Sequence, residues 1–514
     1  MSGHRLHTTR RDLLRALGVA ALGGAATQLV AACGGGSSAP TTTPSAPTAP
    51  AKGGAEVPKP ADKPAAAAPT TAPAAAATAA KPAEAPKPAA PAAASKTLTL
   101  NWITPAEVGL ERDFYTQFMK DYEAKNPGTT IQVSFEAWND YFTKLPTILA
   151  SGSIPDMMHL HGSIAQDYGL RGATKNLFDY MKKDNLSKDL WFQPLIQQMA
   201  DYKTGTKLYA LPKDSAAYAF YYNKDLFDKA GVAYPKKDWS FADFRTAAKG
   251  LTIDKAGKKS GEAGFDGKNI AQFGIAWADP LPSGDSWQMT AWSVAGPWYN
   301  ENYTKGFFDD ADHVDFLQQI ADMRNKDRSI PLASDALGQG DPFRNGLVAM
   351  AIAHHSMVFF YNAEKKTFKF DANYSPSGKL GQFQGVACSG WTLPAKSPHP
   401  DEGWDFIKFL TSQDKQCQIV EAKRWGSPIK ACENNLLPKD NNPPSFKEVL
   451  VDPLNGESKV KTLGILYPPF LSDFKQIWST EFDPVFNGGQ VTAAEAAKKA
   501  QPQIQALLDK AAKM

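Results

Sequence analysis

The sequence has few cysteines, and their number limits how disulfides can stabilise it. Only four of the 514 residues are cysteine, namely Cys33, Cys388, Cys417 and Cys432. The three that follow Cys33 cannot all pair with one another within one chain. A disulfide would require export from a reducing compartment, and Cys417 and Cys432 are the closest pair in sequence. The sequence does not decide whether they pair.

A block of one charge sign is also missing. The chain has 56 Lys and Arg against 53 Asp and Glu, a formal net charge of +3. Residues 1–32 contain four Arg and one Asp, so the rest of the chain is formally neutral. Without a basic block, nucleic acid is excluded as the expected partner. After the N-terminal region, no segment is long and apolar enough to cross a membrane.

The motifs of several enzyme classes are absent as well. We find no HExxH motif, no Ser–Gly nucleophile elbow and no phosphate-binding loop. Glycoside hydrolysis needs only two suitably spaced carboxylates, so the 53 Asp and Glu residues leave that reaction open.

The N-terminal 32 residues have the pattern of an export signal. Arg10 and Arg11 form a basic region, and a moderately apolar stretch runs from Ala16 to Ala32. The stretch "TRRDLL" resembles a twin-arginine signal, although an ordinary basic region would look similar. "VAAC" resembles the lipobox of bacterial lipoproteins, in which Cys33 becomes the lipid-carrying N-terminus. Multiple acyl chains, at about 0.8 kcal/mol per buried CH2, would anchor it firmly.

Residues 33–95 are expected to form a tether without a core. They consist mostly of Ala, Pro, Thr, Ser and Lys and contain no aromatic residue. Frequent Pro prevents the helix that Ala alone would favour. At about 3.1 Å per residue, an extended polyproline-like chain of this length would reach at most on the order of 190 Å.

Residues 96–514 alternate strand and helix patterns and predict an α/β fold. "TLTLNWI" and "TTIQVSFEAW" read as strands, and "PDMMHLH" as a short buried one. Between them, Leu110, Phe114, Phe118 and Tyr122 form one face of a helix that ends before Pro127. Such a βαβαβ order predicts a mainly parallel sheet with ligands beyond the carboxyl ends of its strands. Later, Ser240 and Asp243 form a predicted capping box, with Trp239 packed against Phe244.

Five blocks of the chain together resemble a known family. They are "AKNPGTTIQVSFEAWNDYFTKLPTILASGSIPDMMHLHG", "KLYALPKDSAAYAFYYNKDLFDKAGV", "FRNGLVAMAIAHHSM", "SGWTLPAKSPHPDEGWDFIKFLTS" and "RWGSPI". In number and order they resemble the family 1 extracellular solute-binding proteins of ABC importers, the maltose-binding protein superfamily. One departure lies after "AMAI", where the family often has Gly-x-Trp and this chain has His354, His355 and Ser356.

The resemblance implies a two-lobe periplasmic-binding-protein-like fold of type II. Each lobe would be a mainly parallel sheet flanked by helices, with the ligand in a cleft between the lobes. One lobe would take about 97–212 and 362–412, and the other 213–361 and 413–514. Lobe closure over a ligand needs only a few kcal/mol of differential binding.

Tryptophan suggests the ligand class, because sugar rings stack on flat aromatic faces while their hydroxyls need polar groups. Trp404 and Trp478 lie on helix faces typical of a core. Strand ends or family blocks that line the cleft supply the tryptophan candidates: Trp102, Trp138, Trp277, Trp287, Trp292 and Trp391. The polar candidates are Glu107, His159, Asp214, Asp285, His354, His355 and Arg424.

Metal binding is the main alternative for the histidines. His159 and His161 point the same way in a strand, and His354 is followed by His355. No carboxylate lies at ligand spacing near them, so we predict no metal and no cofactor.

We therefore predict a non-catalytic, lipid-anchored, monomeric protein on the outer side of the cell membrane. It would capture a small solute, which we expect to be a carbohydrate, for an integral permease and its ATPases. A polyamine, metal or glycerol phosphate ligand is the first alternative. A secreted carbohydrate-active enzyme and a structural surface lipoprotein are the others.

Overall fold

The structure is a computed structural model that describes residues 97–106, 110–276, 285–300, 302–338, 341–362, 368–422, 425–432, 443–465 and 467–514. The predicted signal, Cys33 and tether lie outside the described residues.

One of the two principal sheets has five strands, in the order β2-β1-β3-β11-β4. Its strands are β1 (Leu98–Pro105), β2 (Thr129–Glu136), β3 (Met157–His161), β4 (Leu211–Pro212) and β11 (Ser389–Thr392). The β1 strand runs parallel to β2 and β3, whereas β11 runs antiparallel to β3 and β4. The first three strands thus confirm the predicted βαβαβ order.

The other sheet has seven strands, in the order β12-β10-β5-β8-β7-β6, with β9 also paired to β5. Its strands are β5 (Ala216–Asn223), β6 (Ile253–Asp254), β7 (Ile270–Ala276), β8 (Val348–His354), β9 (Phe370–Asn373), β10 (Phe383–Ala387) and β12 (Lys461–Gly464). The β7–β8 and β10–β12 pairs are parallel, and the remaining pairs are antiparallel.

These pairings correct two expectations. Both sheets are mixed rather than mainly parallel, because β11 in one and the neighbours of β5 in the other come from later passages of the chain and pair antiparallel. The resemblance also implies that the segment of about 362–412 belongs to the first lobe. Instead β9 and β10 belong to the seven-stranded sheet, and the chain enters the five-stranded sheet only with β11. Strand pairing over such distances in sequence is not readable from local patterns.

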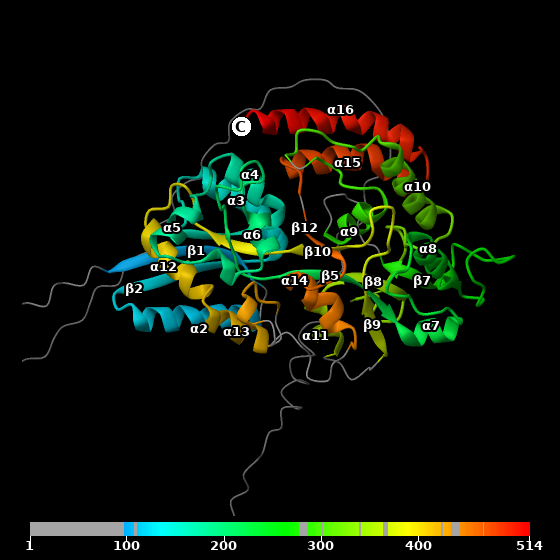
Figure 1. Ribbon diagram of the computed structural model, residues 1–514, viewed down its shortest axis with the longest axis horizontal. Coiled ribbons are helices and arrows are strands. Elements are labelled where there is room, and N and C mark those ends of the chain that lie inside the picture. Colours follow the sequence, from blue (N-terminus) through cyan, green and yellow to red (C-terminus); the bar gives the residue numbers. More distant parts are fainter. Residues whose placement is uncertain are drawn as a thin grey trace, which may run out of the picture. The chain divides into compact units, whose positions relative to one another are not determined.

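Helices cover both sheets, as Figure 1 shows. The helices are α2 (Leu110–Lys125), α3 (Trp138–Ala150), α4 (Gly162–Leu170), α5 (Leu177–Lys183), η1 (Lys188–Leu190), α6 (Gln193–Met199), α7 (Lys224–Ala230), α8 (Phe241–Gly250), α9 (Asp285–Val294), α10 (Ala311–Asn325), α11 (Met357–Asn362), α12 (Pro400–Leu410), α13 (Gln413–Glu421), the π-helix η3 (Lys447–Val451), α14 (Asp452–Asn455), α15 (Leu471–Phe486) and α16 (Ala493–Ala512). Helices α2, α3, α4 and α12 contact strands of the five-stranded sheet, and α8 and α9 contact strands of the other.

Local sequence signals explain where several helices begin and end. The α2 helix spans the predicted apolar face and ends before Pro127. At α8, Ser240 and Asp243 form the predicted capping box, and the rings of Trp239 and Phe244 lie 5.5 Å apart. A reciprocal cap of this kind satisfies two backbone N–H groups that the first turn leaves unpaired.

Two large hydrophobic clusters hold the elements together. One is centred on the five-stranded sheet and extends to α11 and η3, and the other surrounds α8, α10, α15 and α16. Trp404 and Trp478 are buried in them, as predicted. Cys417 and Cys432 form a disulfide, the pairing that the sequence left undecided. Cys388 is a buried free thiol.

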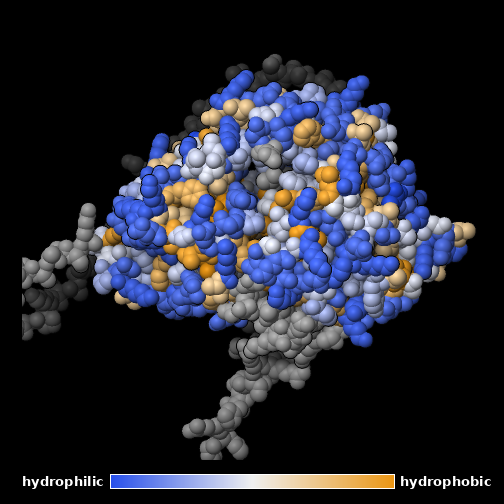
Figure 2. All heavy atoms as spheres, viewed as in Figure 1, coloured by the Kyte–Doolittle hydropathy of each residue, from blue (hydrophilic) through white to orange (hydrophobic). Residues whose placement is uncertain are grey.

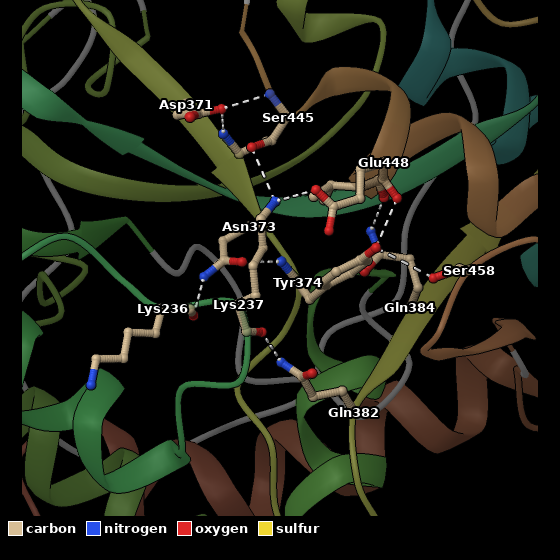
Figure 3. Close-up of polar contacts among 12 residues, drawn as sticks. Lys236, Lys237, Asp371, Asn373, Tyr374, Gln382, Gln384, Ser445, Glu448 and Ser458 are labelled. Atoms are coloured by element: carbon tan, nitrogen blue, oxygen red, sulfur yellow. Dashed lines mark hydrogen bonds and ion pairs between the residues drawn. The ribbon is translucent and has the colours of Figure 1, made fainter.

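A polar network joins η3 to the seven-stranded sheet (Figure 3). The Tyr374 hydroxyl donates to the Glu448 carbonyl at 2.8 Å, and Asp371 Oδ1 accepts from the Ser445 N–H at 3.1 Å. Buried Gln384 donates to a main-chain carbonyl of η3 at 3.1 Å. These bonds fix the segment 443–451 against the sheet.

The surface is mostly hydrophilic on the face drawn in Figure 2, with separate hydrophobic patches. In the part of the chain that the structure describes, no helix combines the length and hydrophobicity needed to span a bilayer.

Candidate functional site

The chain passes between the two sheets at neighbouring points. One passage runs from β4 to β5 through Lys213, Asp214 and Ser215, and another runs from β10 to β11 through Cys388. Asp214 Oδ1 accepts from the Ser389 N–H at 2.6 Å, and the Lys213 N–H donates to the Ser389 carbonyl at 2.8 Å. The two passages are therefore bonded side by side, and residues of both line a cavity.

Two cavities meet here and share Trp138 and His161. The smaller, of about 230 Å³, is lined by Trp138, His161, Asp214, Ser215, Ala216, Tyr218, His354, Ser356, Ala387, Cys388, Ser389 and Trp425. The larger, of about 900 Å³, is lined by α3, α4 and residues of the α15 side, including Tyr168, Asp167, Arg171, Tyr467 and Lys475. The walls of the smaller cavity come from strands of both sheets, as expected for a cleft between lobes.

Trp138 presents its ring to both cavities. It is the first residue of α3 and is 45% exposed, although it is a large apolar side chain. The rings of Phe142, His159 and His161 pack against it edge-on, with centroids 5.0, 5.7 and 5.7 Å away. Its orientation is thus fixed by the protein while much of its surface stays accessible, which is the geometry of a stacking platform.

His161 links the two sides of the cleft. It caps α4, where its Nδ1 accepts from the Ser163 N–H at 3.2 Å and lies 2.8 Å from Ser163 Oγ. Its ring packs edge-on against Tyr467, 5.8 Å away, just before α15. His161 therefore contacts both walls and lines both cavities.

Asp214 supplies the carboxylate of the smaller cavity. Besides the Ser389 N–H, it contacts Lys213 Nζ, which lies 3.1 Å from Asp214 Oδ2. Both oxygens are thus held by the protein, and each carboxylate oxygen can still accept a further hydrogen bond. Of the predicted ligand residues, Trp138, Asp214 and His354 line this cavity together.

Trp102 and Trp391 were predicted to contact the ligand, but neither lines the Trp138 cavities. Each is 1% exposed, and their rings pack edge-on, 5.1 Å apart, beneath the cleft. Trp102 also contacts Tyr115 of α2 and Phe406 of α12, because the alternation of β1 directs it to the helix-covered face of the sheet rather than to the strand end.

His159 and His355 are also buried, which corrects their assignment to the cleft wall. The His159 ring lies beneath Trp138, and burial holds its pKa well below the usual histidine value. His355 Nδ1 accepts from the Ala217 N–H at 2.9 Å, and burial lowers its pKa to about 3. Both imidazoles are therefore neutral packing groups.

Trp292 lies away from the Trp138 cavities. It is half-buried in α9, packs against Phe383 at 6.1 Å and lines a small separate hollow. Asp285 and Trp287 begin α9, but their side chains lie outside the described part of the structure, as do Glu107, Trp277 and Arg424 entirely. Within the described ranges, no group of three or more His, Cys, Asp or Glu side chains could hold a metal ion.

Several cleft residues were missed by sequence reasoning: His161, Tyr218, Ser356, Trp425 and Tyr467. His161 ends the third strand and Trp425 lies in the "RWGSPI" block, so both carried a usable signal. Tyr218 lies in the "KLYALPKDSAAYAFYYNKDLFDKAGV" block, so it carried the same kind of signal. Tyr467 carried none, because it lies in no strand and in none of the five blocks.

Comparison with known proteins identifies the family of this chain. The model for "Bacterial extracellular solute-binding protein" matches residues 109–416. The chain belongs to this family. The family identity means an exported protein of the substrate-binding class.

Individual binding proteins are also similar to this chain in sequence or in structure. The melibiose/raffinose/stachyose-binding protein MelE of Bacillus subtilis is 26% identical over 380 residues, 70% of this chain and 80% of the relative. The structure of an ABC substrate-binding protein from Listeria monocytogenes in complex with cycloalternan matches with a TM-score of 0.65 and 23% identity, covering 80% of this chain and 98% of that one. The maltose/maltodextrin-binding domain MalE from Bdellovibrio bacteriovorus, bound to maltotriose, gives 0.60 and 18%, covering 81% and 100%. The two solved structures establish the two-lobe fold.

Proposed function

We propose that this solute-binding protein captures a sugar or oligosaccharide in the cleft and delivers it to an ABC permease. The observation that carries the proposal is the exposed Trp138 ring, which lies over a cavity that also contains Asp214, His354 and Ser356. A sugar has apolar C–H faces that stack on such a ring and hydroxyls that donate to a carboxylate.

The comparisons support the ligand class. MelE carries the name of an oligosaccharide-binding protein, and the Listeria and Bdellovibrio structures contain cycloalternan and maltotriose. A cleft that combines cavities of about 230 and 900 Å³ also has room for more than one sugar ring.

We further propose that the protein binds without chemistry. Asp214 is the carboxylate among the described residues of the smaller cavity, and both of its oxygens contact Lys213 or Ser389. Glycoside hydrolysis would need a second carboxylate about 5–10 Å away, one of them protonated. The carboxylate of the larger cavity, Asp167, is ion-paired with Arg171 at 2.7 Å, which favours its charged form.

We also propose that the protein is anchored to the membrane. Cys33 would carry lipid, and residues 34–95 would tether the binding lobes near the permease at high effective concentration. The lobes would comprise the five-stranded and the seven-stranded sheet with their helices.

The test is a thermal-shift screen of the full chain against sugars, oligosaccharides, polyols, polyamines and metal ions, followed by calorimetry and by chromatography of the recovered ligand. At 100 times its dissociation constant, a ligand should stabilise the protein by about 2.7 kcal/mol. We expect a saccharide to do so and to be recovered unaltered. Stabilisation by polyamines or metals alone would refute the sugar assignment, and ligand cleavage would refute the non-catalytic one.

A further inference from the structure

Lys213 is a buried cation directly behind the cleft. Its side chain is 5% exposed, and it occupies the passage between β4 and β5. Its Nζ lies 3.1 Å from Asp214 Oδ2 and donates to the Tyr115 hydroxyl at 3.3 Å. The same ammonium lies over the rings of Trp425 at 4.8 Å and Trp391 at 5.2 Å. Aromatic faces thus surround a charge that is paired with the carboxylate of the cleft residue Asp214.

The electrostatics keep this lysine charged. Burial opposes its charge, but the nearby carboxylates of Asp214 and Glu111 outweigh it, and the pKa of Lys213 lies above the usual lysine value. Burial also raises the pKa of Tyr115, so the phenol is neutral and the compensating negative charge comes from the carboxylates of Asp214 and Glu111. Ring faces add cation–π stabilisation, which is stronger in a desolvated site.

The fold alone does not call for this charge. Buried ion pairs are often no more stabilising than apolar residues of similar volume, because desolvation offsets their attraction. A methionine would fill the same aromatic surroundings. The charge instead holds one carboxylate oxygen of Asp214, and the Ser389 N–H holds the other at 2.6 Å.

We propose that Lys213 is a positioning residue for ligand binding, which fixes the Asp214 carboxylate in the orientation that accepts hydrogen bonds from ligand hydroxyls. The inference rests on the proposed capture of a solute in this cleft. Lys213 itself lies behind the cavity wall and acts through Asp214.

The chain contains a matched control in Lys415. It is 6% exposed, its Nζ lies 2.6 Å from Asp121 Oδ2, and it lies over the rings of Phe118 and Phe409 at 4.8 and 5.3 Å. Lys415 is therefore also a buried, carboxylate-paired lysine among aromatic rings, but neither it nor Asp121 lines the Trp138 cavities.

The experiment is a double-mutant cycle in the full chain, using calorimetry with the saccharide that stabilises the wild type best. We expect Lys213→Met and Asp214→Asn each to weaken binding about ten- to hundredfold, the loss typical of a charged hydrogen bond. In the Asp214→Asn background, Lys213→Met should cost little more, because Lys213 acts through Asp214. Lys415→Met should leave the affinity unchanged.

Wild-type affinity in Lys213→Met, or additive losses in the double variant, would overturn the inference. A second readout needs no ligand: the double variant Lys213→Met/Asp214→Asn should unfold at the wild-type temperature or above it, because the pair serves the cleft rather than the fold. A large fall in its unfolding temperature would overturn the inference even if the sugar screen itself had failed.

Discussion

The wall of the cleft and the layer directly beneath it contain the same kinds of residue but have opposite properties. Trp138, His161 and His354 line the cavities, whereas Trp391, His159 and His355 are buried. Strand alternation and backbone turns separate neighbours such as His354 and His355 into different layers.

The difference shows that residue type alone does not identify a binding group. The buried layer consists of rings packed edge to edge, for example His159 between Trp138 and Trp391 at 5.7 and 5.8 Å. Such packing orients the exposed ring above it. Substitutions in the lower layer should therefore change stability, and substitutions in the wall should change affinity.

The largest expected effect is in the lower layer. Trp102→Ala should lower the free energy of unfolding by about 3–5 kcal/mol, because it empties a site that contacts Tyr115, Trp391 and Phe406. Denaturant unfolding monitored by circular dichroism measures it. Trp138→Ala is the comparison and should cost about 1 kcal/mol or less. Equal losses in the two variants would remove the distinction between the layers.

The wall should show the reverse pattern. Trp138→Ala should weaken saccharide binding about ten- to hundredfold, ~1.4–2.8 kcal/mol, through loss of the stacking platform. Calorimetry measures it, with Tyr234→Ala as control, since Tyr234 is 38% exposed and packs against Tyr222 outside the cavities. If both variants bound like wild type, Trp138 would not be the platform.

An intermediate effect concerns pH. The pKa of His355 falls from 6.5 to about 3 on folding, so below pH 6.5 the unfolded chain binds a proton that the native protein does not. Stability should therefore be lost as pH falls from 6.5 towards 3, by about 1.4 kcal/mol per pH unit from this group. Above pH 6.5 the group contributes no slope. Thermal unfolding across this range compares wild type with His355→Gln, whose slope should be smaller; parallel profiles would contradict the assignment.

Sequence patterns predicted the first half of the fold well. The helix with Phe114 and Phe118 on one face, the capping box at Ser240 and the buried strand before His161 all depend on neighbours within a few residues. The mixed order of the second sheet depends instead on pairings such as that of β5 with β8, more than 100 residues apart, and no local pattern encodes them.

The site was predictable only in part for the same reason. Asp214 and Trp138 follow recognisable strands, and both line the cavity. Trp102 also lies near a strand end, but α2 and α12 cover the sheet face to which it points. Which face is covered is a property of tertiary packing, so strand-end position overestimated the number of cleft residues.

The smallest expected effect tests whether the buried layer needs its polar atoms at all. His159 has no hydrogen-bond partner at either ring nitrogen within the described structure. Its ring packs edge to face against neighbouring aromatic rings. A buried unpaired polar group costs about 1–3 kcal/mol, and the extra volume of phenylalanine offsets part of the gain from removing it. His159→Phe should therefore stay within about 1 kcal/mol of wild-type stability, with unchanged saccharide affinity. Denaturant unfolding measures the stability, and calorimetry measures the affinity. A loss of affinity without a loss of stability would show that His159 belongs to the cleft wall and not to the buried layer.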